Sequence, residues 1–299
     1  MRSAISVKER LKNYAKKNHR VVQDVFIVYV LERTLYRLSI SKYKDQFILK
    51  GGILLYGLYE GDFTRATTDI DLLGTGISNE ADKMKTVFSN IFSMECDDPI
   101  AFQLDTLKVP NITEFKHYHG LNVSILALLD RTRIPVSIDI GFGDIVYPDW
   151  VTMDYPTLLD DAPPQMYAYS IESVIAEKFE AIVSLGEVNG RLKDFYDICR
   201  LSEKQDFEGD VLQSAILETF QNRKTSFEKI AAFEGGFCED PLRISRWKGF
   251  LRQKNVQEPI DFSDAIDTLR IFLNPIVESI REGQLFLGSW NHEKKEWIY

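Results

Sequence analysis

The chain has 299 residues, of which 44% are hydrophobic and 27% are charged, and its net charge is −9. This is an ordinary globular composition, long enough for about two domains of roughly 100–200 residues each. The negative charge argues against a protein that coats nucleic acid over its whole surface.

The cysteines and the apolar stretches narrow the class of protein further. The three cysteines, Cys96, Cys199 and Cys238, are odd in number and far apart, which argues against a zinc site and a disulfide framework. The longest apolar stretch, residues 25–31, is far shorter than the ~18 residues that a membrane helix needs. The first twenty residues lack the apolar run of a signal peptide. We therefore predict a cytoplasmic protein with no membrane partner.

Helical and strand-like patterns alternate along the first half of the chain. Ser6 and Glu9 have the spacing of a capping box, and Gly51-Gly52 stops a short apolar run as a tight turn would. The periodicities predict, in chain order, helices over 6–18 and 21–38, a strand over 47–50, a helix over 53–60, a strand over 67–74, a helix over about 79–93, and strands over 100–108, 120–129 and 134–142.

The second half is predicted to be mainly helical. Proline-rich residues 154–164 predict a loop, Ser170 is placed to cap a helix that ends at Gly186, and 191–203 predicts another helix. From about residue 207 onward only helical patterns are found. We predict an α+β protein in which a catalytic domain with a mixed sheet flanked by helices, residues 1–205, precedes a C-terminal helical domain, residues 206–299.

Three aspartates on two predicted strands are the main candidates for chemistry. Residues two apart in a strand share a face, so Asp69 and Asp71 project together, away from the apolar Ile70. Paired carboxylates repel each other unless a cation intervenes, and Mg²⁺ is such a cation. Asp139 lies in the apolar strand VSIDIGF (136–142). Burying an acid there without a partner costs free energy, and a metal-binding pair on a neighbouring strand would supply that partner. Two alternatives stay open. Asp69 and Asp71 could lie at a solvated strand end without a metal, and Asp139 could have a purely structural role.

Two helices supply further candidates. Lys178 interrupts the apolar stripe of the helix 171–185, so it requires an anion, either a buried carboxylate or a ligand phosphate. Snorkelling of its stem to the surface is the alternative. Asp194 and Asp197 share one face of the helix 191–203, as an ordinary amphipathic helix would also allow. His117 and His119 are read as surface residues.

Taken in order, these segments resemble the AbiEii/AbiGii toxin family of nucleotidyltransferases, in the DNA polymerase β-like superfamily. The resemblance rests on LKGGILLYGLYEGDFTRATTDIDLL (49–73), VSIDIGF (136–142) and IESVIAEKFEAIVSLGEVNGRLKDFYDICRL (171–201). It implies a polymerase β-like nucleotidyltransferase fold. Much of the superfamily has Gly-Ser where this chain has Gly51-Gly52, so only main-chain N–H groups remain there to hold phosphate.

The resemblance also assigns roles to the residues. Asp69, Asp71 and Asp139 are expected to be the catalytic carboxylates and the ligands of Mg²⁺ or Mn²⁺. The residues expected to bind the nucleoside triphosphate (NTP) substrate are Gly51, Gly52, Arg65, Thr68, Lys178, Asp194 and Asp197.

The expected reaction moves a nucleoside monophosphate from an NTP to an acceptor hydroxyl and releases pyrophosphate. Two metal ions about 3.5–4 Å apart would clamp the attacking and leaving oxygens, with Asp139 on the ion that activates the hydroxyl. The resemblance implies an RNA acceptor such as the tRNA 3′ end and a cognate antitoxin. A metal-dependent glycosyltransferase that uses a nucleotide-sugar, and a non-catalytic RNA- or protein-binding module, are the alternative functions.

A basic segment near the C-terminus is a candidate RNA contact. Residues 243–254 carry Arg243, Arg246, Lys248, Arg252 and Lys254 and no acid, with Trp247 and Phe250 between them. Such a run can bind phosphate groups, although a solvated helix face gives the same pattern. We expect it to hold the RNA acceptor.

Overall fold

A computed structural model describes residues 3–59, 67–112, 120–253, 256 and 259–299 of the chain. The contacts divide the protein into two units. Unit 1 comprises Met1–Asp144 and Trp150–Tyr169, and unit 2 comprises Ile145–Asp149 and Ser170–Tyr299. The main division between the two units falls near residue 170. The boundary predicted at residue 205 separates a nucleotidyltransferase domain from a C-terminal domain by function, and it stays a prediction.

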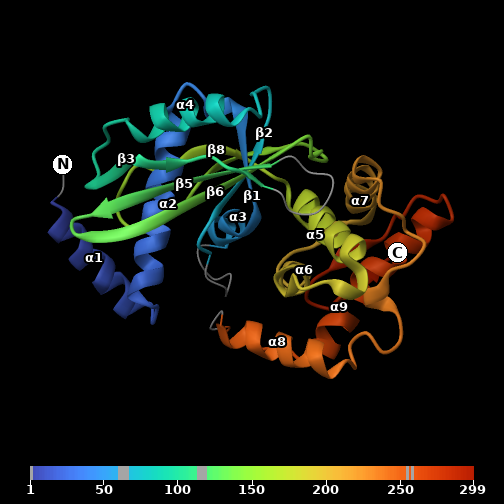
Figure 1. The fold of residues 1–299 in the computed structure, drawn as a ribbon. Coiled ribbons are helices and arrows are strands. Elements are labelled where there is room, and N and C mark those ends of the chain that lie inside the picture. The colour runs from blue at the N-terminus through green and yellow to red at the C-terminus, as the bar shows by residue number, and fades with distance from the viewer. Residues whose placement is uncertain (1–2, 60–66, 113–119, 254–255, 257–258) are drawn as a thin grey trace. The chain divides into compact units, whose positions relative to one another are not determined.

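Unit 1 is built on one mixed sheet with helices against it (Figure 1). The strands lie in the order β3-β5-β6-β2-β1-β8-β7, with β4 paired to β5. The pairs β2–β6 and β1–β8 are parallel, and β1–β2 and β5–β6 are antiparallel. The elements are α1 (Ala4–Lys17), α2 (Val22–Ile40), β1 (Phe47–Lys50), α3 (Gly51–Leu58), β2 (Ile70–Gly74), α4 (Ala81–Phe92), β3 (Ile100–Lys108), β4 (Asn111–Ile112), β5 (Gly120–Leu129), β6 (Thr132–Phe142), β7 (Val151–Asp154) and β8 (Gln165–Ala168).

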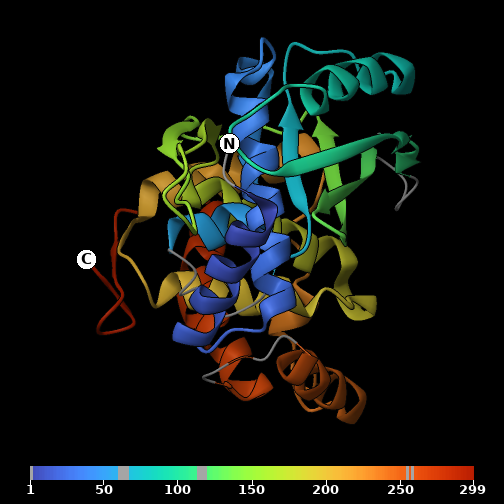
Figure 2. The same cartoon turned by 90° about the vertical axis from the view of Figure 1, so that its left-hand side faces the viewer.

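The core of unit 1 forms where the apolar faces of these strands meet the helices. Ile70 and Leu72 of β2, and Ile138 and Ile140 of β6, are at most 1% exposed, while the residues between them are half-buried. Helix α2 packs against β6 and β8, and α1 lies beside α2, as Figure 2 shows with both helices in blue. The mixed sheet flanked by helices confirms the α+β prediction.

Unit 2 is mainly helical, but it also contains a small sheet. Its elements are α5 (Ile171–Leu185), α6 (Leu192–Ser202), β9 (Phe207–Glu208), α7 (Gly209–Arg223), α8 (Pro241–Gln253), α9 (Phe262–Arg281), β10 (Ser289–Asn291) and β11 (Glu296–Ile298). The sheet order is β11-β10-β9, so the expectation of helices alone after residue 207 is wrong. These strands have two or three residues each, too few for a periodicity to identify them. Within the described chain, no helix has both the length and the apolar character needed to span a membrane.

The helix ends test two of the predicted caps. Ser170 caps α5, since its side chain accepts a hydrogen bond from the main-chain N of Ser173, as predicted. The capping box at Ser6 is wrong, because Ser3 caps α1 and accepts from the main-chain N of Ser6. Two serines three residues apart offer the same cap chemistry, and the sequence alone does not choose between them.

A buried group of ionisable side chains connects α2 to two other segments of unit 1. Glu32, which is fully buried, accepts a hydrogen bond of 2.8 Å from the main-chain N of Leu158. Arg37 donates two bonds, of 2.8 and 2.9 Å, to the carboxylate of Asp98. Buried ionic groups need such partners, because an unpaired charge in the interior costs several kcal/mol.

Glu32 should make the stability of the protein depend on pH. Burial raises its pKa from 4.5 to about 8, against the opposing effects of the bond from Leu158 and the charge of Arg33. The folded state therefore binds more protons than the unfolded state between these values. Stability should fall as the pH rises through this window, by at most about 1.4 kcal/mol per pH unit.

The matched variant for this prediction is Glu32→Gln, which keeps the shape of the side chain and cannot titrate. Urea unfolding from about pH 5 to about pH 8 should give a flatter curve of unfolding free energy for the variant than for the parent. Parallel curves for the two proteins would show that Glu32 does not titrate in this window.

Candidate active site

Asp71 and Asp139 lie side by side on neighbouring strands. In the parallel pair β2–β6, Asp71 is in register with Asp139, between the pairs Ile70–Ile138 and Leu72–Ile140. Because the isoleucine and leucine side chains face the core, both carboxylates are on the opposite face of the sheet. The strand alternation that the sequence predicted is thus confirmed, and the register adds that the two acids are neighbours.

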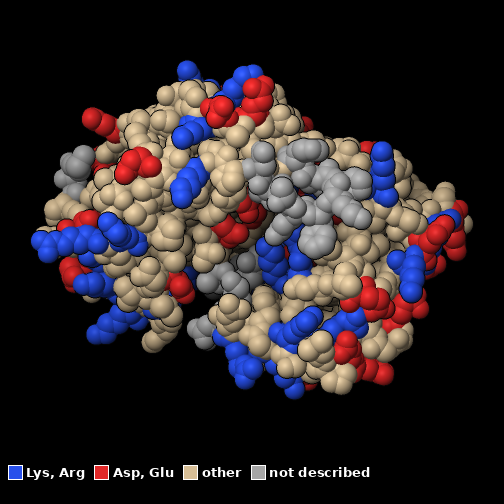
Figure 3. Space-filling model, viewed as in Figure 1, with Lys and Arg blue, Asp and Glu red and all other residues tan. Residues whose placement is uncertain are grey.

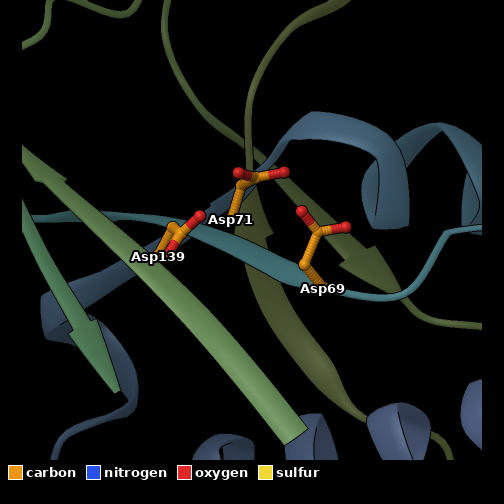
Figure 4. A group of neighbouring side chains, drawn as sticks. All are labelled: Asp69, Asp71 and Asp139. Carbon is orange, nitrogen blue, oxygen red and sulfur yellow. The ribbon is translucent and has the colours of Figure 1, made fainter. Parts of the chain in front are cut away.

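Asp69 completes a group of three carboxylates (Figure 4). The sequence predicted a strand over 67–74 that includes Asp69. In the structure β2 begins at Ile70, so Asp69 lies just before the strand. One oxygen from each of Asp69, Asp71 and Asp139 can be chosen so that all three lie within 4.8 Å of one another. All three residues are half-buried, so part of each is exposed to solvent.

Gly51 leaves room for the Asp71 carboxylate. A Cβ atom built on Gly51 would lie 1.8 Å from Oδ2 of Asp71, far inside any real contact. The φ angle of Gly51 is +68°, in the left-handed region that glycine adopts without strain. Position 51 therefore requires glycine for two reasons: the main chain has a positive φ angle there, and the Asp71 carboxylate leaves no room for a Cβ atom.

The side chain of Asn122 orients Asp139. Its Nδ2 donates to Oδ1 of Asp139 at 2.6 Å and to the hydroxyl of Ser137 at 2.8 Å, from the neighbouring strand β5. Asn122 pairs with Asp139 in the ladder, so both project from the same face. Sequence reasoning missed Asn122, because only the register between the two strands reveals its position.

These three carboxylates fit a divalent cation. They present only oxygen ligands, which suit hard ions such as Mg²⁺ and Mn²⁺. The spacing of their oxygens is small enough for one ion to touch more than one carboxylate. An ionised carboxylate has about four lone-pair sites, so the bond from Asn122 does not by itself prevent Asp139 from binding a cation.

Lys178, Asp194 and Asp197 form a buried cluster in unit 2. The ammonium of Lys178 donates to Oδ1 of Asp194 at 3.0 Å and to Oδ2 of Asp197 at 2.7 Å. Both aspartates are fully buried, and Arg191 adds a bond of 2.8 Å to Asp194. The sequence predicted either a buried carboxylate or a ligand phosphate as the partner of Lys178, and the structure shows buried carboxylates. The predicted contact of Lys178 with a substrate phosphate stays a prediction.

The remaining predicted substrate contacts are not tested by the structure. Gly52 is half-buried in the first turn of α3, and Thr68 is exposed. Arg65 lies outside the described residues, as do His117 and His119.

The basic segment of unit 2 is only partly available to RNA. Lys and Arg side chains gather over α8 (Figure 3). Arg243, however, donates to the main-chain oxygens of Phe237 and Glu187 and stacks on the Phe237 ring, so it serves the fold. Trp247 is 1% exposed and packs inside unit 2. The basic residues of α8 that are exposed are Arg246, Lys248 and Arg252, and Lys254 lies outside the described residues.

The sequence and the structure were compared with known proteins. A candidate nucleotidyltransferase from H. pylori aligns over 87% of this chain and 97% of its own, with 14% identity and a TM-score of 0.48. JHP933 from Helicobacter pylori aligns over 85% and 92%, with 14% identity and a TM-score of 0.46. No curated protein matches the sequence. The family model described as "Nucleotidyl transferase AbiEii toxin, Type IV TA system" matches residues 33–269, which include all three carboxylates. The chain belongs to the AbiEii family of nucleotidyltransferase toxins.

Proposed function

We propose that the protein transfers a nucleoside monophosphate from an NTP to a hydroxyl group of RNA, at a metal site made by Asp69, Asp71 and Asp139. The observation that carries the proposal is the register of Asp71 with Asp139, with Asp69 close enough for the three carboxylates to share a cation. The family is one of nucleotidyltransferases, so the glycosyltransferase and the non-catalytic module are set aside.

Each residue of the site has a part in this proposal. Asp69, Asp71 and Asp139 would hold Mg²⁺ or Mn²⁺, which would supply positive charge beside the triphosphate and the attacking hydroxyl. Asn122 fixes the orientation of Asp139. Gly51 brings the first turn of α3 beside Asp71, where main-chain N–H groups can bind phosphate oxygens.

In the reaction, the acceptor hydroxyl gives its proton to a base, Asp139 or water, and its oxygen forms a bond to the α-phosphorus. The bond from the α-phosphorus to the bridging oxygen of the β-phosphate breaks, and pyrophosphate leaves. Gly52, Arg65, Thr68, Lys178, Asp194 and Asp197 remain the predicted substrate contacts.

The proposed partners follow from the family and from the charge of unit 2. A toxin of a type IV toxin–antitoxin family implies a cognate antitoxin. The exposed Arg246, Lys248 and Arg252 of α8 are candidate phosphate contacts for an RNA such as the tRNA 3′ end. If they hold RNA, the reaction should need more RNA as the salt concentration rises, because phosphate contacts release counterions.

The test is a transfer assay with each NTP radiolabelled at the α-phosphorus, Mg²⁺ and total RNA. We expect label to enter RNA, to be lost when a chelator removes the metal, and to return when excess Mg²⁺ or Mn²⁺ is added. The γ-labelled NTP should leave no label on RNA, because that phosphate departs in pyrophosphate. Transfer that persists in the chelator would disprove the metal site, and transfer of the γ-label would identify a kinase instead.

A further inference from the structure

Lys50 places a cation beside the three carboxylates. It is the last residue of β1, and in the antiparallel ladder it pairs with Asp71. Residues that pair directly in such a ladder project from the same face, with α-carbons about 4.5–5.5 Å apart. The four-carbon stem of a lysine can bridge that separation, so the ammonium of Lys50 is within reach of the Asp71 carboxylate.

In the structure the ammonium of Lys50 is held by Asp144. Its Nζ lies 2.8 Å from Oδ2 of Asp144, and the two side chains are 14% and 3% exposed. The Tyr169 ring lies on the same ammonium, with its centroid 5.3 Å away. An ion pair this buried keeps a defined geometry, unlike the loose pairs of an exposed surface.

The ion pair lies beside Gly141, on the side to which a side chain at this position would point. A Cβ atom built on Gly141 would lie 3.4 Å from Oδ2 of Asp144 and 3.6 Å from Nζ of Lys50. Gly141 is two residues after Asp139 in β6, so its α-carbon faces the same side of the sheet as the catalytic carboxylates. The pair therefore lies on the active-site face, next to the place proposed for the metal.

We propose that Asp144 is a positioning residue that keeps the Lys50 ammonium over Gly141, beside the carboxylates, so that it does not occupy the place of the divalent cation. This inference rests on the proposed metal site. Three neighbouring carboxylates attract any cation, and a tethered ammonium has a high effective concentration. Asp144 counters that attraction with a carboxylate of its own. Lys50 thus lowers the negative potential of the site without filling it.

The test measures Mn²⁺ affinity by the electron paramagnetic resonance signal of the free ion, which does not depend on turnover. Asp144→Asn should weaken Mn²⁺ binding on the order of tenfold, because Lys50 then turns to Asp71 and competes with the ion. Lys50→Met should bind Mn²⁺ at least as tightly as the parent. The double variant, Lys50→Met with Asp144→Asn, should regain the parent affinity, because the competing ammonium is gone.

The control variant is Glu80→Gln, which makes the same change of net charge at an exposed ion pair with Lys83 on α4. It should leave the affinity unchanged. Equal Mn²⁺ affinity in the parent and in folded Asp144→Asn, or weaker binding by Lys50→Met, would overturn the inference while leaving the metal site intact. Mn²⁺ binding that does not change in Asp71→Asn would instead overturn the proposed function.

Discussion

Replacing Asp71 with asparagine is expected to lower the rate of nucleotide transfer on the order of a thousandfold, as the loss of one preorganised electrostatic group does in other enzymes. Asp71 lies between the other two carboxylates and the turn at Gly51, so its charge acts at the centre of the site. Asparagine keeps the size of the side chain but removes the charge that holds the cation. Stability should be unchanged or slightly higher, since one carboxylate fewer repels its neighbours.

The measurement is the initial rate of transfer from α-labelled NTP, with circular dichroism and a melting curve to show that the variant is folded. Asp105→Asn is the matched control, because Asp105 is an exposed aspartate on β3 of the same sheet. The control should retain the parent rate. A folded Asp71→Asn protein with normal transfer would remove Asp71 from the catalytic group.

Lys178→Ala is expected to destabilise the protein by about 3–5 kcal/mol, the cost of leaving a buried charge without its partner. Removing the ammonium leaves Asp194 and Asp197, both fully buried, without the cation that lies 3.0 and 2.7 Å from them. A lysine whose anion is only a ligand phosphate, one of the two options that the sequence left open, would leave stability unchanged or higher when it is removed. The structure instead gives Lys178 two carboxylates of helix α6 as partners.

Urea unfolding of the variant and the parent checks this effect, and Lys83→Ala is the matched control. Lys83 also pairs with an acid, Glu80, but both side chains are 63% exposed, so its loss should have little effect on the free energy of unfolding. Titration with NTP separates the two roles of Lys178. A stable variant with weakened NTP binding would show that the lysine acts on the substrate and not on the fold.

The candidate catalytic aspartates could be predicted because strand alternation is a local property. Asp71 and Asp139 each interrupt a run of buried apolar residues, and a window of a few residues is enough to detect this. Their adjacency was inferred from the need for a partner charge and from the resemblance. The register of β2 with β6, which places them side by side, depends on contacts between segments about seventy residues apart.

Other parts of the site could not be predicted, because they also depend on contacts between segments that are far apart in the sequence. Asn122 and Asp144 acquire their roles only through partners on other strands, Asp139 and Lys50. The small sheet of unit 2 was missed because its strands are very short. Their stability comes instead from aromatic packing, such as the stacking of Trp297 on Phe272.

The contact between Gly51 and Asp71 also restricts how the enzyme can evolve. Every other amino acid brings a Cβ atom into the volume of the carboxylate, so a single replacement at this position is expected to displace the Asp71 side chain while every charged residue remains. No side chain can be recruited at position 51 to recognise a base or a phosphate. A lineage that acquires a new nucleotide preference must therefore do so through mutations elsewhere, with this turn kept as a fixed part of the scaffold.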